Sequence, residues 1–125
     1  MESNVGRGRR GESIAAAWLE ARGWTVLDRN WRDGPRELDL VAHRDGTLAF
    51  LEVKTRSSDA FGAPLESIGP RKRRDVERAA RAWIRSRTPE IDGVRALRFD
   101  AVSVRLNPSG AHEILHVEGA WRTGE

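Results

Sequence analysis

The 125-residue sequence predicts a single α/β domain in which helices flank a mixed β-sheet. Three observations support this class. Apolar residues recur at helical spacing in two segments, residues 10–22 and 70–87. Short apolar runs bounded by Gly, Pro, Asn and Asp predict strands between and after these helices. The length suits one hydrophobic core and is too short for a second independent one. The expected element order is αβββαββ.

The first predicted helix runs from about Arg10 to Arg22, and Gly23 is placed to end it. Its apolar face consists of residues at helical spacing: Ile14, Ala15, Trp18, Leu19 and Ala21. Residues 1–9 and 122–125 are rich in Gly and charge, and we expect both ends of the domain to be flexible.

Three strands are predicted next. Trp24–Trp31 forms the first, and a polar turn at Arg32–Arg36 follows it. Glu37–His43 and Thr47–Lys54 are apolar runs on either side of Asp45-Gly46, and Asp-Gly between such runs is the strongest short signal of a β-hairpin. These two strands are therefore expected to be antiparallel.

Residues 56–69 lack periodicity and predict a long loop, a feature that is uncommon in compact domains unless it has a function. The second helix covers residues 70–87, with a proline in its first turn and a Thr-Pro pair after its end. Two final strands, Ala96–Leu106 and Ala111–Val117, are joined by a turn at residues 107–110.

The register of the central hairpin follows from its turn. If Asp45-Gly46 is a two-residue turn, paired residues have numbers that sum to 91, which places Asp39 opposite Glu52 and Glu37 opposite Lys54. A three-residue loop or a bulge would shift this pairing. Since directly opposed residues share a face, three carboxylates and one ammonium would converge on one side of the sheet.

Like charges placed this closely are destabilising unless something compensates them, and a divalent cation would do so. The apolar runs around these residues predict strands covered on both faces, where an unpaired charge is costly. Oxygen ligands without Cys or His favour Mg²⁺ or Mn²⁺. Lys54 is one of only two lysines beside 20 arginines, and its compact ammonium suits a water-orienting or charge-stabilising role. The alternative is a structural salt bridge at a sheet edge.

Asp39, separated by twelve residues from Glu52-Val53-Lys54, resembles the PD-(D/E)XK nuclease signature. The longer string ELDLVAHRDGTLAFLEVKTR is similar to the short bacterial YraN family, which is related to archaeal Holliday-junction resolvases. The resemblance covers most of the chain through these further residues: Gly11, Glu12, Ala16, Leu19, Gly23, Asn30, Arg32, Thr55, Arg56, Gly62, Lys72, Arg98, Phe99 and Asp100. Pro35-Arg36 departs from the family, which usually has Gly before the Glu-hydrophobic-Asp triplet.

The resemblance implies one restriction-endonuclease-like domain over residues 1–125, with a central mixed sheet of about five strands. It also implies that Asp39, Glu52 and Glu12 bind the metal and that Lys54 assists the attacking water. Glu12 has an alternative reading as a first-turn residue that the helix dipole favours. Glu37 either joins the site, pairs with Lys54 or faces solvent.

Basic residues on the second helix predict a nucleic-acid contact. Four arginines follow i, i+4, i+7, i+11 spacing on one helix face, although such a stripe can also be an ordinary solvated surface. The predicted nucleic-acid-binding residues are Arg56, Arg71, Lys72, Arg74, Arg78, Arg81 and Arg85. Trp31 and Trp121 are candidates for base stacking, and the three histidines show no ligand spacing.

The sequence thus favours a Mg²⁺- or Mn²⁺-dependent endonuclease, acting on branched or structured DNA if the resolvase resemblance holds. A non-catalytic nucleic-acid-binding or adaptor protein and an RNA-processing nuclease remain the alternatives. Symmetric cutting of a junction would need a homodimer, with the last strand and Trp121 as candidate contacts unless that strand lies inside the monomer's sheet. The absence of cysteine, of an apolar leader and of a membrane-spanning run predicts a cytoplasmic protein without a membrane partner.

Overall fold

The computed structural model describes residues 4–57, 68–87 and 91–124. Its elements, in chain order, are α1 (Asn4–Glu20), β1 (Thr25–Asp33), β2 (Arg36–Arg44), β3 (Thr47–Ser57), α2 (Pro70–Ser86), β4 (Ala96–Leu106) and β5 (His112–Trp121). The predicted order αβββαββ and the α/β class are confirmed. Within the described residues, neither helix is long and apolar enough to cross a membrane.

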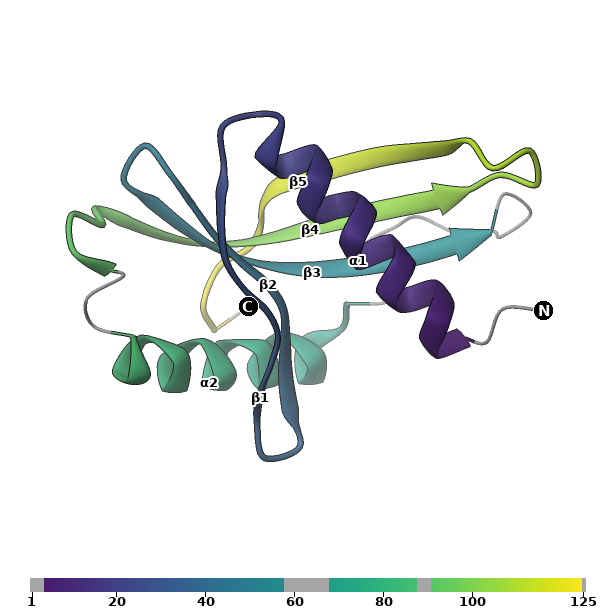
Figure 1. Ribbon diagram of the computed structural model, residues 1–125. Helices are drawn as coiled ribbons and strands as arrows, with labels where there is room; N and C mark the ends of the chain where they lie inside the picture. Colours follow the sequence, from purple (N-terminus) through teal and green to yellow (C-terminus); the bar gives the residue numbers. More distant parts are fainter. Residues whose placement is uncertain (1–3, 58–67, 88–90, 125) are drawn as a thin grey trace.

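The five strands form one open sheet in the order β1-β2-β3-β4-β5. Only β3 and β4 are parallel, and α2 provides the crossover between them; the other neighbours are antiparallel. The two helices lie on opposite faces of the sheet (Figure 1). This is the mixed, two-sided arrangement of a restriction-endonuclease-like sandwich.

The core has two layers because side chains alternate along β3. Leu48 and Phe50 pack in the cluster that contains the apolar face of α2, whereas Ala49 and Leu51 pack in the cluster that contains the apolar face of α1. The prediction that these strands are covered on both faces is therefore confirmed.

Helix α1 begins at Asn4, six residues before the predicted start, and it ends at Glu20. Its first turns are polar, so hydrophobic periodicity carries no signal there. Gly23 follows in the left-handed conformation (φ 89°), and the Trp24 N–H donates to Leu19 O at 3.1 Å. The expected role of this glycine in ending the helix is confirmed.

The β2–β3 hairpin has the predicted register over its first five pairs, from Arg44 opposite Thr47 to Leu40 opposite Leu51. Asp45 and Gly46 both have positive φ, at 50° and 79°, as a two-residue turn of this handedness requires.

Beyond Leu40 the ladder with β3 stops, so the predicted backbone pairs Asp39–Glu52 and Glu37–Lys54 are wrong. Glu37 pairs instead with Arg32 of β1, and β2 continues as half of the β1–β2 hairpin, which passes α2 (Figure 1). The backbone turns at Asp39: Leu40 packs in the α1-side core, but Leu38, two residues away, packs in the α2-side core.

Strand β5 extends to Trp121, four residues past the predicted end, and pairs with β4 alone. It is therefore an edge strand, and the alternative of an inner strand is wrong. Trp121 is 3% exposed and its ring lies 5.3 Å from that of Phe99, so the suggested base-stacking and dimer-contact roles of Trp121 are also wrong. Trp31 is partly buried against the α2-side core. The part of the predicted loop at residues 58–67, with Gly62, lies outside the described residues.

Candidate metal and nucleic-acid site

The end of the β2–β3 ladder positions the first site residue. Had the ladder continued, Val53 would face Leu38; instead, the Val53 N–H donates to Oδ2 of Asp39 at 2.8 Å. The Asp39 side chain thus replaces a main-chain acceptor where β2 leaves β3. Its carboxyl group is held at this fork, and the backbone group that the divergence would leave unsatisfied gains a partner.

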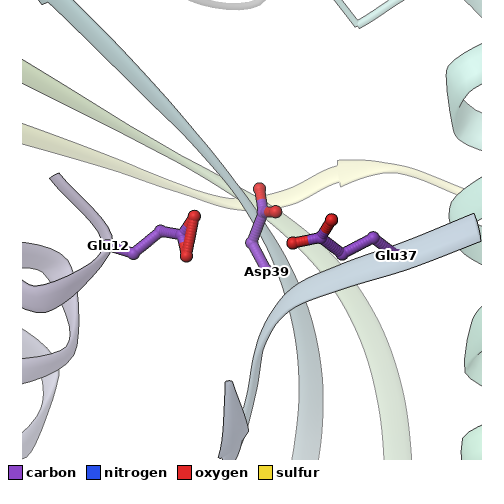
Figure 2. A group of neighbouring side chains, drawn as sticks. All are labelled: Glu12, Glu37 and Asp39. Atoms are coloured by element: carbon purple, nitrogen blue, oxygen red, sulfur yellow. The ribbon is translucent and has the colours of Figure 1, made fainter. Parts of the chain in front are cut away.

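Three carboxyl groups meet at the fork: Glu12, Glu37 and Asp39. Each offers an oxygen atom, and these three atoms lie within 4.8 Å of one another. Glu12 reaches the fork from α1, and the other two side chains project from β2 (Figure 2). We refer to these three residues as the carboxylate cluster. Of the three possibilities left open for Glu37, the structure has the first: its carboxyl group lies in this cluster. Its Oε2 also lies 3.1 Å from Arg32.

Glu12 reaches the cluster because α1 lies very close to β3. Its neighbour Gly11 is buried, and a Cβ at that position would overlap Oγ1 of Thr55 and lie 2.9 Å from the Thr55 Cβ. On the other side, the Asn30 side chain hydrogen-bonds to Glu12. Asn30 has a positive φ of 49°, a conformation that Asn tolerates better than most residues.

Glu52 lies against the cluster without being part of its tight trio. It is 4% exposed, the charge of Asp39 acts on its carboxyl group, and Nζ of Lys72 lies 3.5 Å from its Oε1. Lys54 follows two residues later on the same face of β3, and its charge acts on Glu52. The structure thus brings together Glu12, Asp39, Glu52 and Lys54, and it adds Glu37 and Lys72.

Burial and mutual repulsion raise the pKa of these acids. Burial, followed by the charges of Asp39 and Glu37, raises the pKa of Glu12 from 4.5 to about 7. Burial and then the charge of Asp39 raise the pKa of Glu52 from 4.5 to about 7, against the lowering effect of Lys72 and Lys54. Burial also raises the pKa of Asp39, although the Val53 N–H and Lys72 oppose it. Burial and neighbouring acids therefore make the ionised forms of these carboxyl groups costly despite the nearby lysines.

These residues fit a hard divalent cation. Oε2 of Glu12 is buried and has no hydrogen-bond partner, so an acceptor is left without a donor inside the site. The surrounding groups offer carboxylate oxygens, the ligands that Mg²⁺ and Mn²⁺ prefer. A cation at this position would satisfy that oxygen and offset the repulsion.

The arginine stripe of α2 faces solvent. Its exposed members are Arg71, Arg74, Arg78, Arg81 and Arg85. No carboxylate of the described residues lies within 4.0 Å of any of them. Lys72, which the sequence grouped with this surface, reaches inward to Glu52, because it lies on a different side of the helix. Arg56 is on β3, opposite Arg105 of β4.

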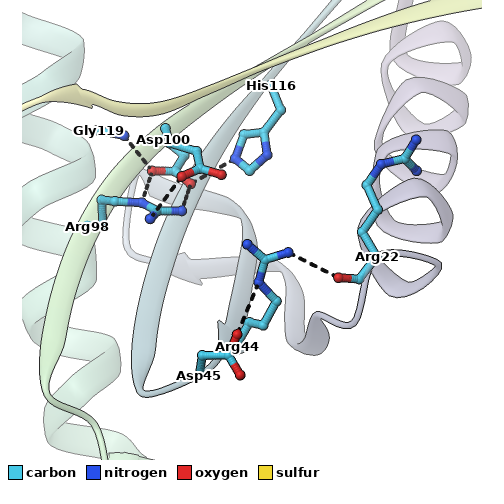
Figure 3. A network of polar contacts seen from close by, with 8 residues as sticks. Arg22, Arg44, Asp45, Arg98, Asp100, His116 and Gly119 are labelled. Atoms are coloured by element: carbon cyan, nitrogen blue, oxygen red, sulfur yellow. Dashed lines mark hydrogen bonds and ion pairs between the residues drawn. The ribbon is translucent and has the colours of Figure 1, made fainter.

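One polar network was not predicted. Asp100 of β4 is fully buried and accepts hydrogen bonds from Arg98 Nε and Nη2, from the Gly119 N–H and from Nε2 of His116, at 2.8–2.9 Å (Figure 3). Burial alone would raise the pKa of Asp100, but His116, Arg98 and Gly119 lower it. The Arg98-x-Asp100 spacing places both side chains on one strand face, whereas the contact with His116 depends on how β5 pairs. This network ties β5 to β4.

A model of a known protein family, described as "Uncharacterised protein family UPF0102", matches residues 11–104, about three quarters of the chain. The chain belongs to the UPF0102 family. A UPF0102 protein of Leifsonia xyli subsp. xyli is 44% identical over 112 residues, covering 90% of this chain and 92% of its own. One from Beutenbergia cavernae is 43% identical over 119 residues, covering 95% and 98% of the two chains. A third, from Bifidobacterium longum subsp. infantis, is 41% identical and covers 91% of each.

The UPF0102 match agrees with the resemblance to the short bacterial YraN family. The matched span includes the carboxylate cluster, Glu52, both lysines and all of α2. It ends before β5, so the part of the Asp100 network that His116 and Gly119 supply lies outside it. The wider resemblance to PD-(D/E)XK nucleases stays a prediction.

Proposed function

We propose that this UPF0102 protein is a Mg²⁺- or Mn²⁺-dependent endonuclease that hydrolyses phosphodiester bonds in nucleic acid. One observation carries the proposal: Glu12, Glu37 and Asp39 place oxygens within 4.8 Å of one another, beside Glu52 and its lysine partner. Two of these acids have cationic partners, Glu37 in Arg32 and Glu52 in Lys72, as they would in a structural salt bridge. The pKa values of Glu12 and Glu52 nevertheless rise to about 7, because burial and neighbouring acids outweigh the available positive charge.

Glu12 and Asp39 are the first candidates to hold the metal, because they share the fork and approach it from different elements. Glu37 completes the group from β2, and Glu52 is close enough for the charge of Asp39 to act on it. When bound, the metal would polarise a phosphoryl oxygen and lower the pKa of a water molecule. The supporting hydrogen bond from Val53 fixes the Asp39 carboxyl group in advance.

The two lysines of the chain supply the positive charge near the acids. Hydrolysis of a phosphodiester increases negative charge on the phosphate oxygens in the transition state, and fixed ammonium groups stabilise that charge. Lys72 already lies 3.5 Å from Glu52, and Lys54 acts on the same carboxyl group. Lys54 is the better candidate to contact the reacting phosphate, because it has no carboxylate within 4.0 Å among the described residues, whereas Lys72 is held by Glu52.

We propose nucleic acid as the substrate because the exposed arginines of α2 lie on the same side of the sheet as Glu52 and Lys54. Arginine forks suit backbone phosphates. DNA is favoured over RNA, and branched DNA over linear duplex, by the resemblance to junction resolvases.

The test is cleavage of four-way junction, flap, single-stranded and duplex substrates, as DNA and as RNA, with Mg²⁺, Mn²⁺ or EDTA. Asp39→Asn keeps an oxygen for the Val53 N–H but removes the charge, so we expect cleavage to fall at least about 100-fold while the fold persists. Glu113→Gln makes the same kind of neutralisation at an exposed position of β5 and should cleave normally. Binding of these substrates without metal-dependent cleavage would favour the adaptor alternative.

A further inference from the structure

A second feature is a hollow of about 420 Å³ between α2 and the turn of the β1–β2 hairpin. Its walls are formed by Pro35, Arg36, Arg71, Arg74, Asp75 and Arg78. We call it the arginine hollow. It differs from the rest of the α2 stripe, since Arg81 lines a separate hollow of about 500 Å³ among aromatic residues such as Phe50 and Phe99.

The arginine hollow has positive charge in excess. Four guanidinium groups face it, and Asp75 is the one acid among its lining residues. Asp75 lies 3.7 Å from Nε of Arg36, which is close enough for an ion pair but too far for a hydrogen bond. Arg71, Arg74 and Arg78 are exposed and have no carboxylate within 4.0 Å among the described residues. Converging like charges without counter-ions favour an anion.

Arg36 provides a separate indication. Its Nε atom is buried and has no hydrogen-bond partner, so the wall of the arginine hollow contains an N–H donor without an acceptor. Buried N–H donors rarely lack a hydrogen bond, because no other interaction offsets the free energy lost when the group leaves water. A ligand with several oxygen acceptors would draw the Arg36 guanidinium into a bonded position.

Helix α2 places the arginine hollow near the acids of the site. Arg36 directly precedes Glu37 of the carboxylate cluster, but successive side chains of a strand point to opposite faces, so the helix carries the connection. On the facing helix, Asp75 follows Lys72 by three residues, about one turn, and Lys72 contacts Glu52. An anion in the hollow would therefore lie about one turn along α2 from the lysine that contacts Glu52.

We propose that the arginine hollow is a subsite for one backbone phosphodiester of the nucleic acid, adjacent to the phosphodiester at the carboxylate cluster. The inference rests on the proposed function for its substrate, and it deepens that function by assigning Arg36, Arg71, Arg74 and Arg78 to one phosphate. Arginine forks bind phosphate oxygens in pairs, and such contacts fix the register of a strand without reading its sequence. The subsite would set which bond reaches the acids.

Binding can be measured apart from cleavage, in EDTA, by fluorescence anisotropy of a labelled four-way DNA junction. We expect the pair Arg74→Ala and Arg78→Ala to weaken binding about 10-fold or more and to lower the salt slope by about 1. Arg85→Ala is the matched control, because Arg85 is exposed on the same helix but does not line the hollow. It should weaken binding less than about 3-fold. Equal losses per arginine would instead indicate that the whole stripe attracts nucleic acid non-specifically. Unchanged melting temperatures verify that the variants fold.

The decisive experiment replaces single phosphates near the crossover by uncharged methylphosphonates, one linkage at a time. At one linkage we expect about a 10-fold loss for the unaltered protein and less than about a 2-fold loss for the Arg74/Arg78 double variant, since the contact is already gone. Non-additivity of this kind identifies a direct contact even if the protein proves not to cleave. Additive losses at every linkage would overturn the proposal. A second outcome would also overturn it: no linkage behaves in this way, and inorganic phosphate competes with the junction for the unaltered protein but not for the double variant. The hollow would then be a site for a free anion.

Discussion

Neutralising Glu52 is expected to stabilise the protein, although Glu52 is central to the proposed site. Its folded-state pKa of about 7 lies above the value of 4.5 expected for the unfolded chain. Between these values the folded state binds more protons at Glu52 than the unfolded chain does, so the contribution of Glu52 to stability is most favourable below about pH 4.5 and falls as the pH rises towards 7. The raised pKa corresponds to about 3 kcal/mol of stability lost by pH 8. Glu52→Gln preserves the shape and removes this penalty.

Urea denaturation in EDTA at pH 5, 6.5 and 8 measures the effect. At pH 8 we expect Glu52→Gln to gain about 2–3 kcal/mol, less a small loss from the half-exposed partner Lys72, or about 10 °C in melting temperature. At pH 5 the gain should shrink. The exposed control Glu113→Gln should change stability by less than about 0.5 kcal/mol at either pH. A Glu52→Gln protein that is less stable at pH 8, or equally pH-dependent, would refute the argument that the site is under electrostatic strain.

Three further predictions concern the surroundings of the site. Gly11→Ala should destabilise the fold by about 1–2 kcal/mol, because the added Cβ would overlap Thr55. Gly8→Ala, at a position with open space around it, should instead stabilise α1 by up to about 1 kcal/mol, and thermal melting compares the two variants. Asp100→Asn should cost about 3 kcal/mol in urea denaturation, since it leaves Arg98 without its buried partner, and a loss below 1 kcal/mol would contradict a structural role. Sedimentation with and without a four-way junction tests pairing through the β5 edge, where Leu115 is 51% exposed; a monomer in both cases would exclude paired incision.

The sequence predicted what local chemistry determines. The Asp45-Gly46 turn sets the hairpin register through positive φ values that few other residue pairs accept, so the pairing down to Leu40 could be worked out in advance. The grouping of Asp39 with Glu52 followed from that register. The two residues stay close beyond the end of the ladder because the Asp39 carboxyl group accepts a hydrogen bond from the Val53 N–H across the fork.

The remaining features depend on contacts between distant segments. Beyond Leu40, β2 leaves β3 and pairs with β1 alone, and Leu38 packs in the α2-side core, which no periodicity in the sequence indicates. Lys72 was assigned to the outer surface because it is adjacent to arginines, but the orientation of α2 turns it towards Glu52. His116 carried no recognisable spacing, and its bond to Asp100 depends on a β4–β5 pairing that shifts between Phe99 and Ala101.

The parallel pairing of β3 with β4 has a consequence for the order of folding. Thr47 pairs with Ala96, 49 positions later, whereas all four acids of the site lie on α1, β2 and β3, before the crossover. Hairpins form in microseconds, but long-range parallel pairing is slow because the entropy of closing the loop is lost before the pairing contacts form. The acids can therefore be assembled from nearby chain segments, while Lys72 and most of the arginine hollow arrive only with α2. A nascent chain would therefore carry all four acids of its site with only Lys54 and Arg32 as nearby cations, before Lys72 is in place.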